Sequence, residues 1–267
     1  MIIDFHTHCF PDALAPRAMA SLKSNCEGSH IVAHTDGTAQ GAKTILTEAG
    51  VDMAVVCNIA TNARQEKNVN SFAISLLENP FFAPLGSVHP DSESIEEELD
   101  RLLLGGIKGV KLHPDYVGVE LSDKRYDRIF SLLRERGMFT VVHAGFDPVS
   151  PNKIHATPEM FRRVIDTHKG LKLVAAHMGG FNMSEGVLSH LVGTDIYLDT
   201  SLSSLRHREK ENLHKILQQH DPDRLLFGTD TPWTEPKEEV AFIRSAPITD
   251  TLREKIFSEN AKALLGI

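Results

Sequence analysis

The sequence predicts a (β/α)8 barrel, an α/β fold in which eight parallel strands form a closed ring surrounded by helices. Short segments rich in Val, Ile, Leu and Phe alternate along the chain with longer, charged segments of helical period. The short segments lack a regular polar–apolar alternation, which is typical of parallel strands buried on both faces. Eight such units within 267 residues match the usual size of this barrel.

Each element has its own signal. We expect strands at residues 2–6, 52–57, 82–88, 109–113, 139–143, 172–177, 196–199 and 224–228. We expect helices at residues 39–49, 63–78, 92–104, 123–136, 158–169, 184–191 and 206–220, with one or two more within 236–265. Ser92, Asp123 and Thr157 are of the residue types that cap helix N-termini, and they stand at three of these predicted helix starts.

An open, doubly wound parallel sheet is the alternative fold. No Gly-x-Gly-x-x-Gly motif follows the first predicted strand, which weakens a dinucleotide-binding version of that fold. No linker or shift in composition divides the chain, so we expect one domain over residues 1–267. The longest irregular stretch is 9–38, and in a barrel it would lie over the carboxyl ends of the strands as a lid or substrate loop.

The composition narrows the classes of function. The formal net charge of −8 argues against nucleic acid as a partner, and no apolar run approaches the length of a membrane span. Cys9, Cys26 and Cys57 form neither a disulfide framework nor a Cys-x-x-Cys motif, which fits a reducing compartment. Because the first predicted strand begins at residue 2, we expect no targeting peptide and a cytoplasmic protein. The expected partner is a small-molecule substrate. Formation of a homodimer is possible as well.

Polar residues end five of the predicted strands, and in a barrel all carboxyl ends meet at one mouth. A lone histidine or aspartate there has an ordinary structural explanation, such as a hydrogen bond to a loop. Together, however, these groups would be costly to bury without partners, and a divalent metal ion satisfies several imidazoles and a carboxylate at once. The strand-end residues are His6, His8, Lys111, His113, His143, His177 and Asp230.

Five stretches contain these residues: DFHTH at 4–8, GVKLHP at 109–114, VHAG at 142–145, AHMGG at 176–180 and FGTDTPW at 227–233. In these stretches, and in their order, the chain resembles the amidohydrolase superfamily of metal-dependent barrel hydrolases. It is most similar to the amidohydrolase-related branch (amidohydrolase 2), which also holds decarboxylases and hydratases. No glutamate ends the fourth strand, which departs from the deoxyribonuclease branch.

The resemblance implies a metal centre held by His6, His8, His143 and Asp230. It implies that His177 is an active-site residue, which either polarises the substrate or binds a second ion. One Zn²⁺ ion is the favoured cofactor. A second ion bound through Lys111 and His177, or Mn²⁺ or another divalent ion in place of zinc, stays open.

These features predict a metal-dependent hydrolase that uses a metal-activated water on a C–N or C–O bond of an amide, lactone or ester. Asp230 would accept the proton of the water, and His177 would donate a hydrogen bond to the carbonyl oxygen. The same site could instead decarboxylate or hydrate an unsaturated dicarboxylic acid. A nuclease, or a binding protein with a vestigial site, is a further alternative.

Substrate recognition is expected to involve a carboxylate. Lys111 and His113, with Arg17 or Arg64, would hold that group. Lys111 could equally be carbamylated and bridge two metal ions. Four aromatic residues just past strand ends would line an apolar pocket or pack a lid: Phe10, Phe146, Phe181 and Trp233.

Overall fold

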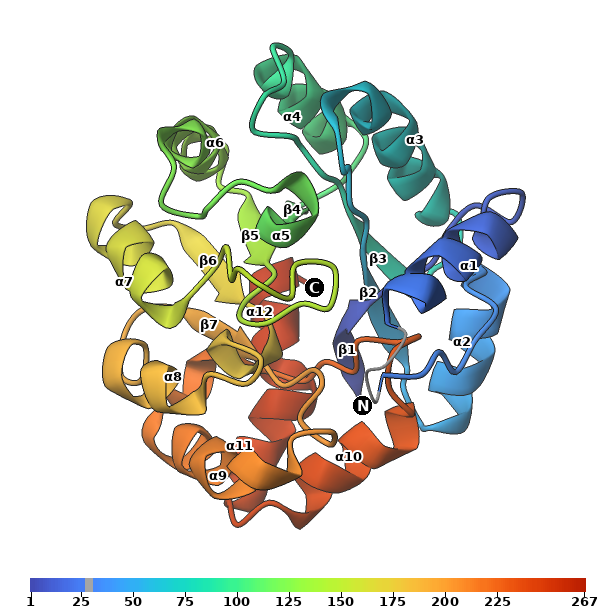
Figure 1. Ribbon diagram of the computed structural model, residues 1–267. Helices are drawn as coiled ribbons and strands as arrows, with labels where there is room; N and C mark the ends of the chain where they lie inside the picture. The colour runs from blue at the N-terminus through green and yellow to red at the C-terminus, as the bar shows by residue number, and fades with distance from the viewer. Residues whose placement is uncertain (27–30) are drawn as a thin grey trace.

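Eight short parallel strands form a ring in the computed structural model, which describes residues 1–26 and 31–267 (Figure 1). They are β1 (Ile3–Thr7), β2 (Met53–Cys57), β3 (Phe82–Leu85), β4 (Gly109–Leu112), β5 (Phe139–Val142), β6 (Lys172–Ala175), β7 (Tyr197–Asp199) and β8 (Leu225–Leu226). All eight predicted strands are present. Several end earlier than predicted, because the polar residues after them turn toward the centre instead of continuing the ladder.

The ring is closed, which rules out the open doubly wound sheet. Strands pair in the order β1-β2-β3 and β4-β5-β6-β7-β8, and all of these pairs are parallel. Gly86 pairs with Val110 and so joins β3 to β4. On the other side, the Phe5 N–H donates to the Phe227 carbonyl at 2.7 Å, and joins β1 to the chain after β8.

Helices surround the ring (Figure 1). They are α1 (Ala15–Asn25), α2 (Ala39–Glu48), α3 (Glu66–Leu76), α4 (Ile95–Leu104), α5 (Pro114–Val117), α6 (Lys124–Glu135), α7 (Pro158–Thr167), α8 (Ser184–His190), α9 (Lys210–Gln219), α10 (Pro236–Ser245), α11 (Asp250–Glu254) and α12 (Asn260–Leu265). Asp123 and Thr157 cap α6 and α7 as predicted. Ser92 caps no helix, because its hydroxyl donates to the Glu66 carboxylate at 2.6 Å instead.

The stretch 9–38 is less irregular than predicted. It contains α1, whose buried residues Ala15 and Met19 lie four positions apart and so share one face. Residues 27–30 of this stretch lie outside the described part of the chain. The described remainder lies over the carboxyl ends of the strands, where the lid was expected.

Two apolar layers stabilise the barrel. The larger one lies between the strands and the helices. The smaller one fills the ring and includes Phe5, Phe139 and Val141 from the strands, together with Leu264 and Leu265 of α12. Figure 1 shows α12 beside the centre of the ring, where it covers the interior. Burying this apolar surface on both sides of the strands leaves only the opposite end of the ring open to ligands.

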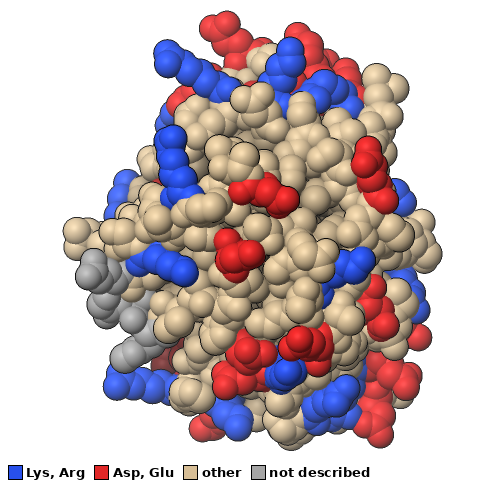
Figure 2. Space-filling model, turned by 90° about the vertical axis from the view of Figure 1, so that its right-hand side faces the viewer, with Lys and Arg blue, Asp and Glu red and all other residues tan. Residues whose placement is uncertain are grey.

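Charged side chains are interspersed on the surface. On the face in Figure 2, Lys and Arg lie close to Asp and Glu around the edge, and acidic side chains also interrupt the uncharged area in the middle. Within the described residues, no helix combines the length and the apolar character that crossing a membrane requires.

Candidate metal centre

A cavity of about 580 Å³ opens at the carboxyl ends of the strands. All seven strand-end residues singled out from the sequence line it, and so do the aromatic side chains of Phe10, Phe146, Phe181 and Trp233. Arg17 of α1 also contributes to the lining. Arg64 is not among the described residues that line this cavity. The predicted substrate residues therefore share one pocket, with the exception of Arg64.

A β-bulge directs the first histidine pair into this pocket. The pairing of β1 with β2 shifts register between Asp4 and Thr7. As a result both Phe5 and His6 face the interior, although neighbouring strand residues normally alternate. The buried Asp4 carboxylate holds the bulge, because it accepts hydrogen bonds from the backbone N–H of His6 at 3.0 Å and of Thr229 at 2.9 Å. Burial raises the pKa of Asp4 to about 7.

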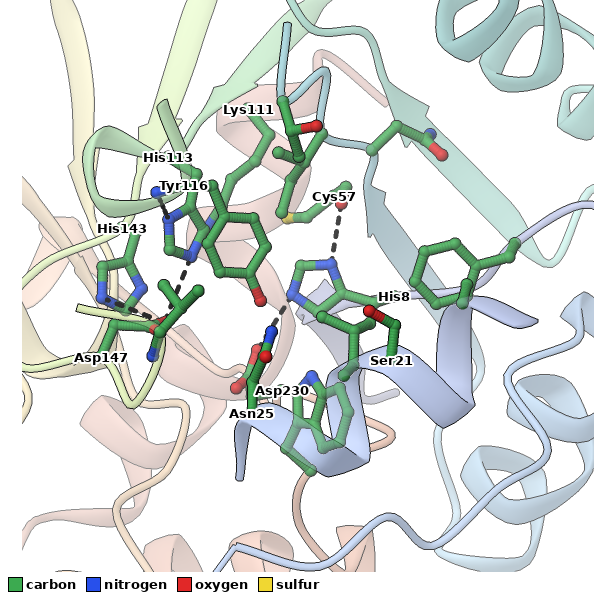
Figure 3. Close-up of a pocket in the computed structure, with 18 of the residues that line it drawn as sticks. His8, Ser21, Asn25, Cys57, Lys111, His113, Tyr116, His143, Asp147 and Asp230 are labelled. Carbon is green, nitrogen blue, oxygen red and sulfur yellow. Dashed lines mark hydrogen bonds and ion pairs between the residues drawn. The ribbon is translucent and has the colours of Figure 1, made fainter. Parts of the chain in front are cut away.

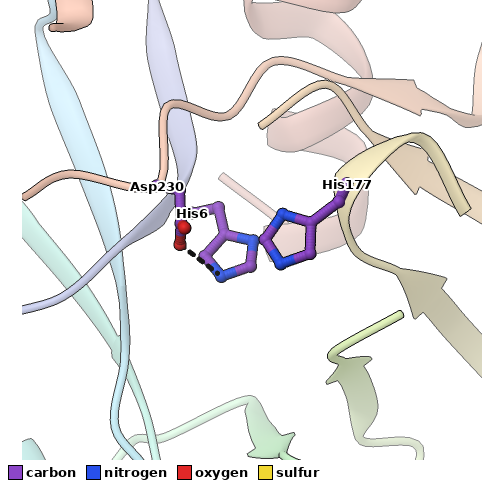
Figure 4. Close-up of side chains that lie close together, drawn as sticks. All are labelled: His6, His177 and Asp230. Carbon is purple, nitrogen blue, oxygen red and sulfur yellow. Dashed lines mark ion pairs between the residues drawn. The ribbon is translucent and has the colours of Figure 1, made fainter. Parts of the chain in front are cut away.

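His6, His8 and Asp230 meet at the centre of the mouth (Figures 3 and 4). Asp230 Oδ1 lies 3.3 Å from His6 Nε2 and 3.1 Å from His8 Nε2. The Asp230 N–H also donates to the His6 carbonyl at 2.7 Å, and its φ of +68° is unusual for a residue other than glycine. The first and last strands of the barrel thus bring a carboxylate against two imidazoles.

The hydrogen-bond partners of His6 and His8 determine which nitrogen of each ring carries the proton. His8 Nδ1 lies 2.8 Å from the Cys57 carbonyl oxygen, which can only accept, so the proton is on Nδ1. His6 Nδ1 lies 2.9 Å from Asp199 Oδ2, and the same reasoning applies to this carboxylate. Burial lowers the pKa of His6, which favours the neutral ring. In its neutral form, each ring therefore has its lone pair on Nε2, the atom that faces Asp230.

Asp199 also orients the imidazole of His177, through the hydroxyl of Ser201. Its Oδ1 accepts a very short hydrogen bond from the Ser201 hydroxyl, so Ser201 Oγ must accept the proton of His177 Nδ1, which lies 2.7 Å away. Burial alone would raise the pKa of Asp199, but His6, Lys111 and these hydrogen bonds lower it below its usual value. The ionised carboxylate leaves His177 Nε2 with a lone pair.

The resulting donor set fits a divalent ion. Ligand atoms of His6, His177 and Asp230 lie within 4.8 Å of one another (Figure 4). Burial holds the pKa of His177 well below its usual value, so this ring is also neutral. A carboxylate and neutral imidazoles that are each oriented by a second hydrogen bond are typical ligands of zinc and similar ions.

Lys111 points into the same cluster. Its side chain is fully buried, and Nζ lies 3.0 Å from His6 Nε2. Because Nε2 carries a lone pair, the lysine donates this hydrogen bond. Lys111 therefore faces the mouth as predicted, next to the group of candidate ligands.

His143 contacts this cluster through His177. Its Nδ1 donates to His177 Nε2 at 3.1 Å, and its Nε2 lies 3.8 Å from Asp147 Oδ2. His113 stacks on His143 with ring centroids 4.1 Å apart, and Tyr116 stacks on His113 at 3.8 Å. Figure 3 shows His113, His143 and Asp147 together on one side of the pocket. Of the four expected metal ligands, Asp230 thus lies against His6 and His8, and His143 reaches this cluster through His177.

Sequence reasoning missed several polar residues of the site: Asp199, Ser201, Asp115 and Asp147. Asp199 had a usable signal, since it ends a predicted strand in the same way as the histidines do. Asp147 and Asp115 lie in segments after β5 and β4, four and two residues beyond a strand-end histidine. No periodic pattern distinguishes these two from ordinary surface aspartates.

A known protein family and several solved structures are similar to this chain. The amidohydrolase family model (Amidohydro_2) matches residues 3–267. No curated protein sequence matches the chain. An uncharacterised TIM-barrel protein from Bordetella bronchiseptica is similar in structure, with 20% identity and a TM-score of 0.76 over 99% of this chain and 98% of that one.

Two solved enzymes share the same fold. One is 5-carboxyvanillate decarboxylase from Novosphingobium aromaticivorans, complexed with manganese (14% identity, TM-score 0.71, 100% of this chain and 96% of that chain). The other is a probable 2-pyrone-4,6-dicarboxylic acid hydrolase from Acinetobacter baumannii (15% identity, TM-score 0.70, 100% and 99%). The family model spans all eight strands and every strand-end residue named above. The chain therefore belongs to the amidohydrolase family.

Proposed function

We propose that this protein is a metal-dependent hydrolase that cleaves a C–N or C–O bond in an amide, lactone or ester of a small carboxylated substrate. One observation supports the proposal above all others. Asp230 Oδ1 lies 3.3 Å from His6 Nε2 and 3.1 Å from His8 Nε2, and the outer hydrogen bonds of both neutral rings leave these nitrogens as lone-pair donors. A divalent cation is the group that satisfies all three at once.

In this proposal His6, His8 and Asp230 hold the ion, and His177 Nε2 lies beside it. When bound, the ion supplies Lewis acidity and lowers the pKa of a coordinated water toward about 7. Asp230 accepts the proton of the attacking water on its carboxylate and returns it to the leaving group. Zn²⁺ is our first candidate because the donors are mostly imidazoles, and Mn²⁺ is the second because a structural relative contains it.

The proton positions favour one of the two roles considered for His177. A neutral ring with its proton on Nδ1 cannot donate a hydrogen bond from Nε2. We therefore place His177 as a metal ligand or as an acceptor. Lys111 becomes the donor to the substrate carboxylate or to the oxygen on which negative charge develops.

The pocket suggests the class of substrate. Its volume suits a small molecule, and its walls include Phe10, Phe146, Phe181 and Trp233. Lys111 and Arg17 bring positive charge to this pocket, whose lining also includes Asp147 and Asp230. We propose a ring-bearing carboxylic acid. The names of the two related enzymes also denote carboxylic acids.

Decarboxylation at the same site is the second candidate function, and the aromatic walls favour it. An apolar wall removes water from a substrate carboxylate and so destabilises its charged form relative to a transition state in which that charge spreads into the ring. One of the related structures is a decarboxylase. Both reactions would use the same residues, so only the reaction product, an opened ring or amide on the one hand and CO₂ on the other, distinguishes them.

The test combines metal analysis with a substrate panel. The purified protein is assayed with lactones and amides of ring carboxylic acids for ring or amide opening, and with the free acids for CO₂ release. We expect hydrolysis, at least a hundredfold loss of kcat in Asp230→Asn, and loss of a metal equivalent in His6→Ala. Asp250→Asn, on an exposed helix end, is the matched control.

Full metal content together with unchanged activity in both site variants would end the proposal. Release of CO₂ without hydrolysis would replace it with the decarboxylase. Mass spectrometry of the intact protein gives an additional result, because a carbamylated Lys111 would be heavier by one CO₂. That modification would convert Lys111 from a cation into a metal ligand.

A further inference from the structure

The cavity extends beyond the candidate metal ligands toward two helices, α1 and α3. These helices follow β1 and β2, and Figure 1 shows both on the same side of the ring. Residues of both helices line the cavity, whose volume is about 580 Å³. Cavities of roughly 300–1,000 Å³ hold drug-sized ligands, and a single ring with a carboxylate is smaller than such a ligand. A ring-bearing acid alone would therefore leave part of the cavity unfilled.

α1 contributes an apolar row and a polar row to this part of the cavity. Ala18 and Leu22 lie four residues apart and so share one face, and Ser21 and Asn25 form a polar row beside them. Figure 3 shows Ser21 and Asn25 directed into the pocket. The residues that α1 buries in the core lie on another face, and Leu22 stays partly exposed.

α3 offers a similar mixture of side chains. Asn68, Val69 and Phe72 recur at helical spacing on the face that borders the cavity. Phe72 also packs against the larger apolar layer, whereas Val69 is only partly buried. We call the part of the cavity that these residues line together with Ala18 and Leu22 the α1–α3 groove. Its apolar side chains would gain from being covered by an apolar chain.

The aromatic wall of the pocket lies away from this groove. Phe146 and Phe181 follow β5 and β6, where the Phe146 N–H donates to the Phe181 carbonyl at 3.0 Å. In Figure 3, His143, just after β5, and Ser21 of α1 lie on opposite sides of His8. A substrate that is cleaved at the centre of the mouth thus has room for two parts, a ring on one side and a second group on the other.

We propose that the substrate is an open-chain amide or ester, in which a ring-bearing carboxylic acid carries an alkyl acyl chain, and that this chain lies in the α1–α3 groove. The inference rests on the proposed function and narrows it, because the two parts of a lactone stay in one ring. Water would supply the hydroxyl group that the acyl carbon gains and the proton that the leaving amine or alcohol gains. The products would be a fatty acid and the ring-bearing acid.

The test measures binding separately from cleavage. The ligands are 4-acylbenzoates with acetyl, butyryl and hexanoyl chains, in which a ketone replaces the amide and cannot be hydrolysed. Burying one methylene group strengthens binding by up to about fourfold. Because the groove is partly open, we expect the Kd from isothermal titration calorimetry to fall by at least about tenfold over the four methylene groups from acetyl to hexanoyl.

Val69→Trp and Ala18→Trp fill the groove from its two sides, so each is expected to abolish the gain in affinity with chain length. Leu104→Trp adds the same indole at a residue of α4 that is 90% exposed, and it is expected to keep the gain. Circular dichroism and the Tm check that each variant folds. The 4-acylaminobenzoates carry the same chains in a form that can be cleaved, and their kcat/KM is expected to rise with chain length.

Equal Kd values for the three ketones in the wild type would overturn this inference and leave the proposed function standing. A dependence on chain length that persists in both Val69→Trp and Ala18→Trp would overturn it as well. Length-dependent binding that both variants abolish, without cleavage of the amides, would support the groove and count against the hydrolase. Absence of binding by the whole series would overturn the chain together with the ring-bearing acid.

Discussion

Asp199 is the residue on which the proton positions in the pocket depend. One carboxylate oxygen accepts from His6 Nδ1, and the other accepts from Ser201, whose hydroxyl in turn accepts from His177. A single buried charge thus directs the lone pairs of two imidazoles toward the mouth. Such outer partners determine metal affinity almost as strongly as the ligands do.

Asp199→Asn is therefore expected to weaken metal binding by about 10- to 100-fold while the barrel stays folded. The amide removes the negative charge and places a donor group where only acceptors fit, so at least one ring loses its orientation. Competition titration with a Zn²⁺ chelator measures the change. Asp166→Asn is the control for loss of one negative charge. An affinity within twofold of the wild type would show that Asp199 does not orient the ligands.

Glu239 gives a prediction about pH. It is buried, with Oε1 accepting from the Ser204 N–H and hydroxyl at 3.1 and 2.6 Å. Burial raises the pKa of Glu239 from 4.5 to about 8. The folded state thus holds this proton more tightly than the unfolded state. Its contribution to stability is complete below pH 4.5 and is lost as the pH rises toward 8, by at most about 1.4 kcal/mol per pH unit.

Glu239→Gln removes this dependence, because the amide stays neutral. The free energy of unfolding of the wild type, relative to that of the variant, is expected to fall between pH 5 and pH 8. Urea denaturation at several pH values measures it, with Glu93→Gln on the exposed surface as the control. Parallel pH profiles for wild type and Glu239→Gln would contradict the prediction.

At the scale of the elements, the strands were predictable and the loops were not. Runs of Val, Ile and Leu locate all eight strands, because burial on both faces leaves a continuous apolar signal in each. α1 was missed because only Ala15 and Met19 are buried, which gives a weak helical period. The bulge in β1 was also invisible, since simple alternation puts Phe5 and His6 on opposite faces.

The surroundings of His143 were likewise out of reach of the sequence. They depend on where the loops after β4 and β5 place Asp115 and Asp147, and on the ring orientation of His143. Those are set by contacts between segments far apart in the chain. The sequence could indicate that polar strand ends converge, but not which of them would meet.

Gly145, in the loop after β5, lies against the loop after β6, and this contact gives a testable prediction. It has a φ of +88°, and a Cβ there would lie 2.1 Å from the Phe181 nitrogen in the loop after β6. Gly145→Ala must therefore separate the loops after β5 and β6. Gly170 has a similar φ of +84° with nothing within 4 Å, so Gly170→Ala carries the backbone penalty alone.

We expect Gly170→Ala to lose about 1 kcal/mol of stability and Gly145→Ala to lose at least about 2 kcal/mol more, with weaker metal binding as well. Denaturant unfolding and metal titration measure both effects. Equal losses in the two variants would mean that the loop contact at Gly145 adds nothing.

At the scale of the whole molecule, the candidate centre joins the two ends of the chain. β1 supplies His6 and His8, and the segment after β8 supplies Asp230. The same region closes the ring through Thr7, which pairs with Thr231. α12 covers the opposite end with apolar side chains. An ion at the mouth would therefore stabilise the closure of the barrel in addition to any role in catalysis.

Removing the metal is accordingly expected to lower the Tm. An ion at a hundred times its Kd stabilises the folded state by about 2.7 kcal/mol, which corresponds to roughly 5–10 °C for a chain of this size. The Tm is measured by circular dichroism in the metal-loaded protein and after dialysis against EDTA. His6→Ala should respond less to EDTA than the wild type, because it lacks a ligand of the ion between β1 and the segment after β8. A Tm that EDTA leaves unchanged in the wild type would mean that no bound ion links the two ends of the barrel.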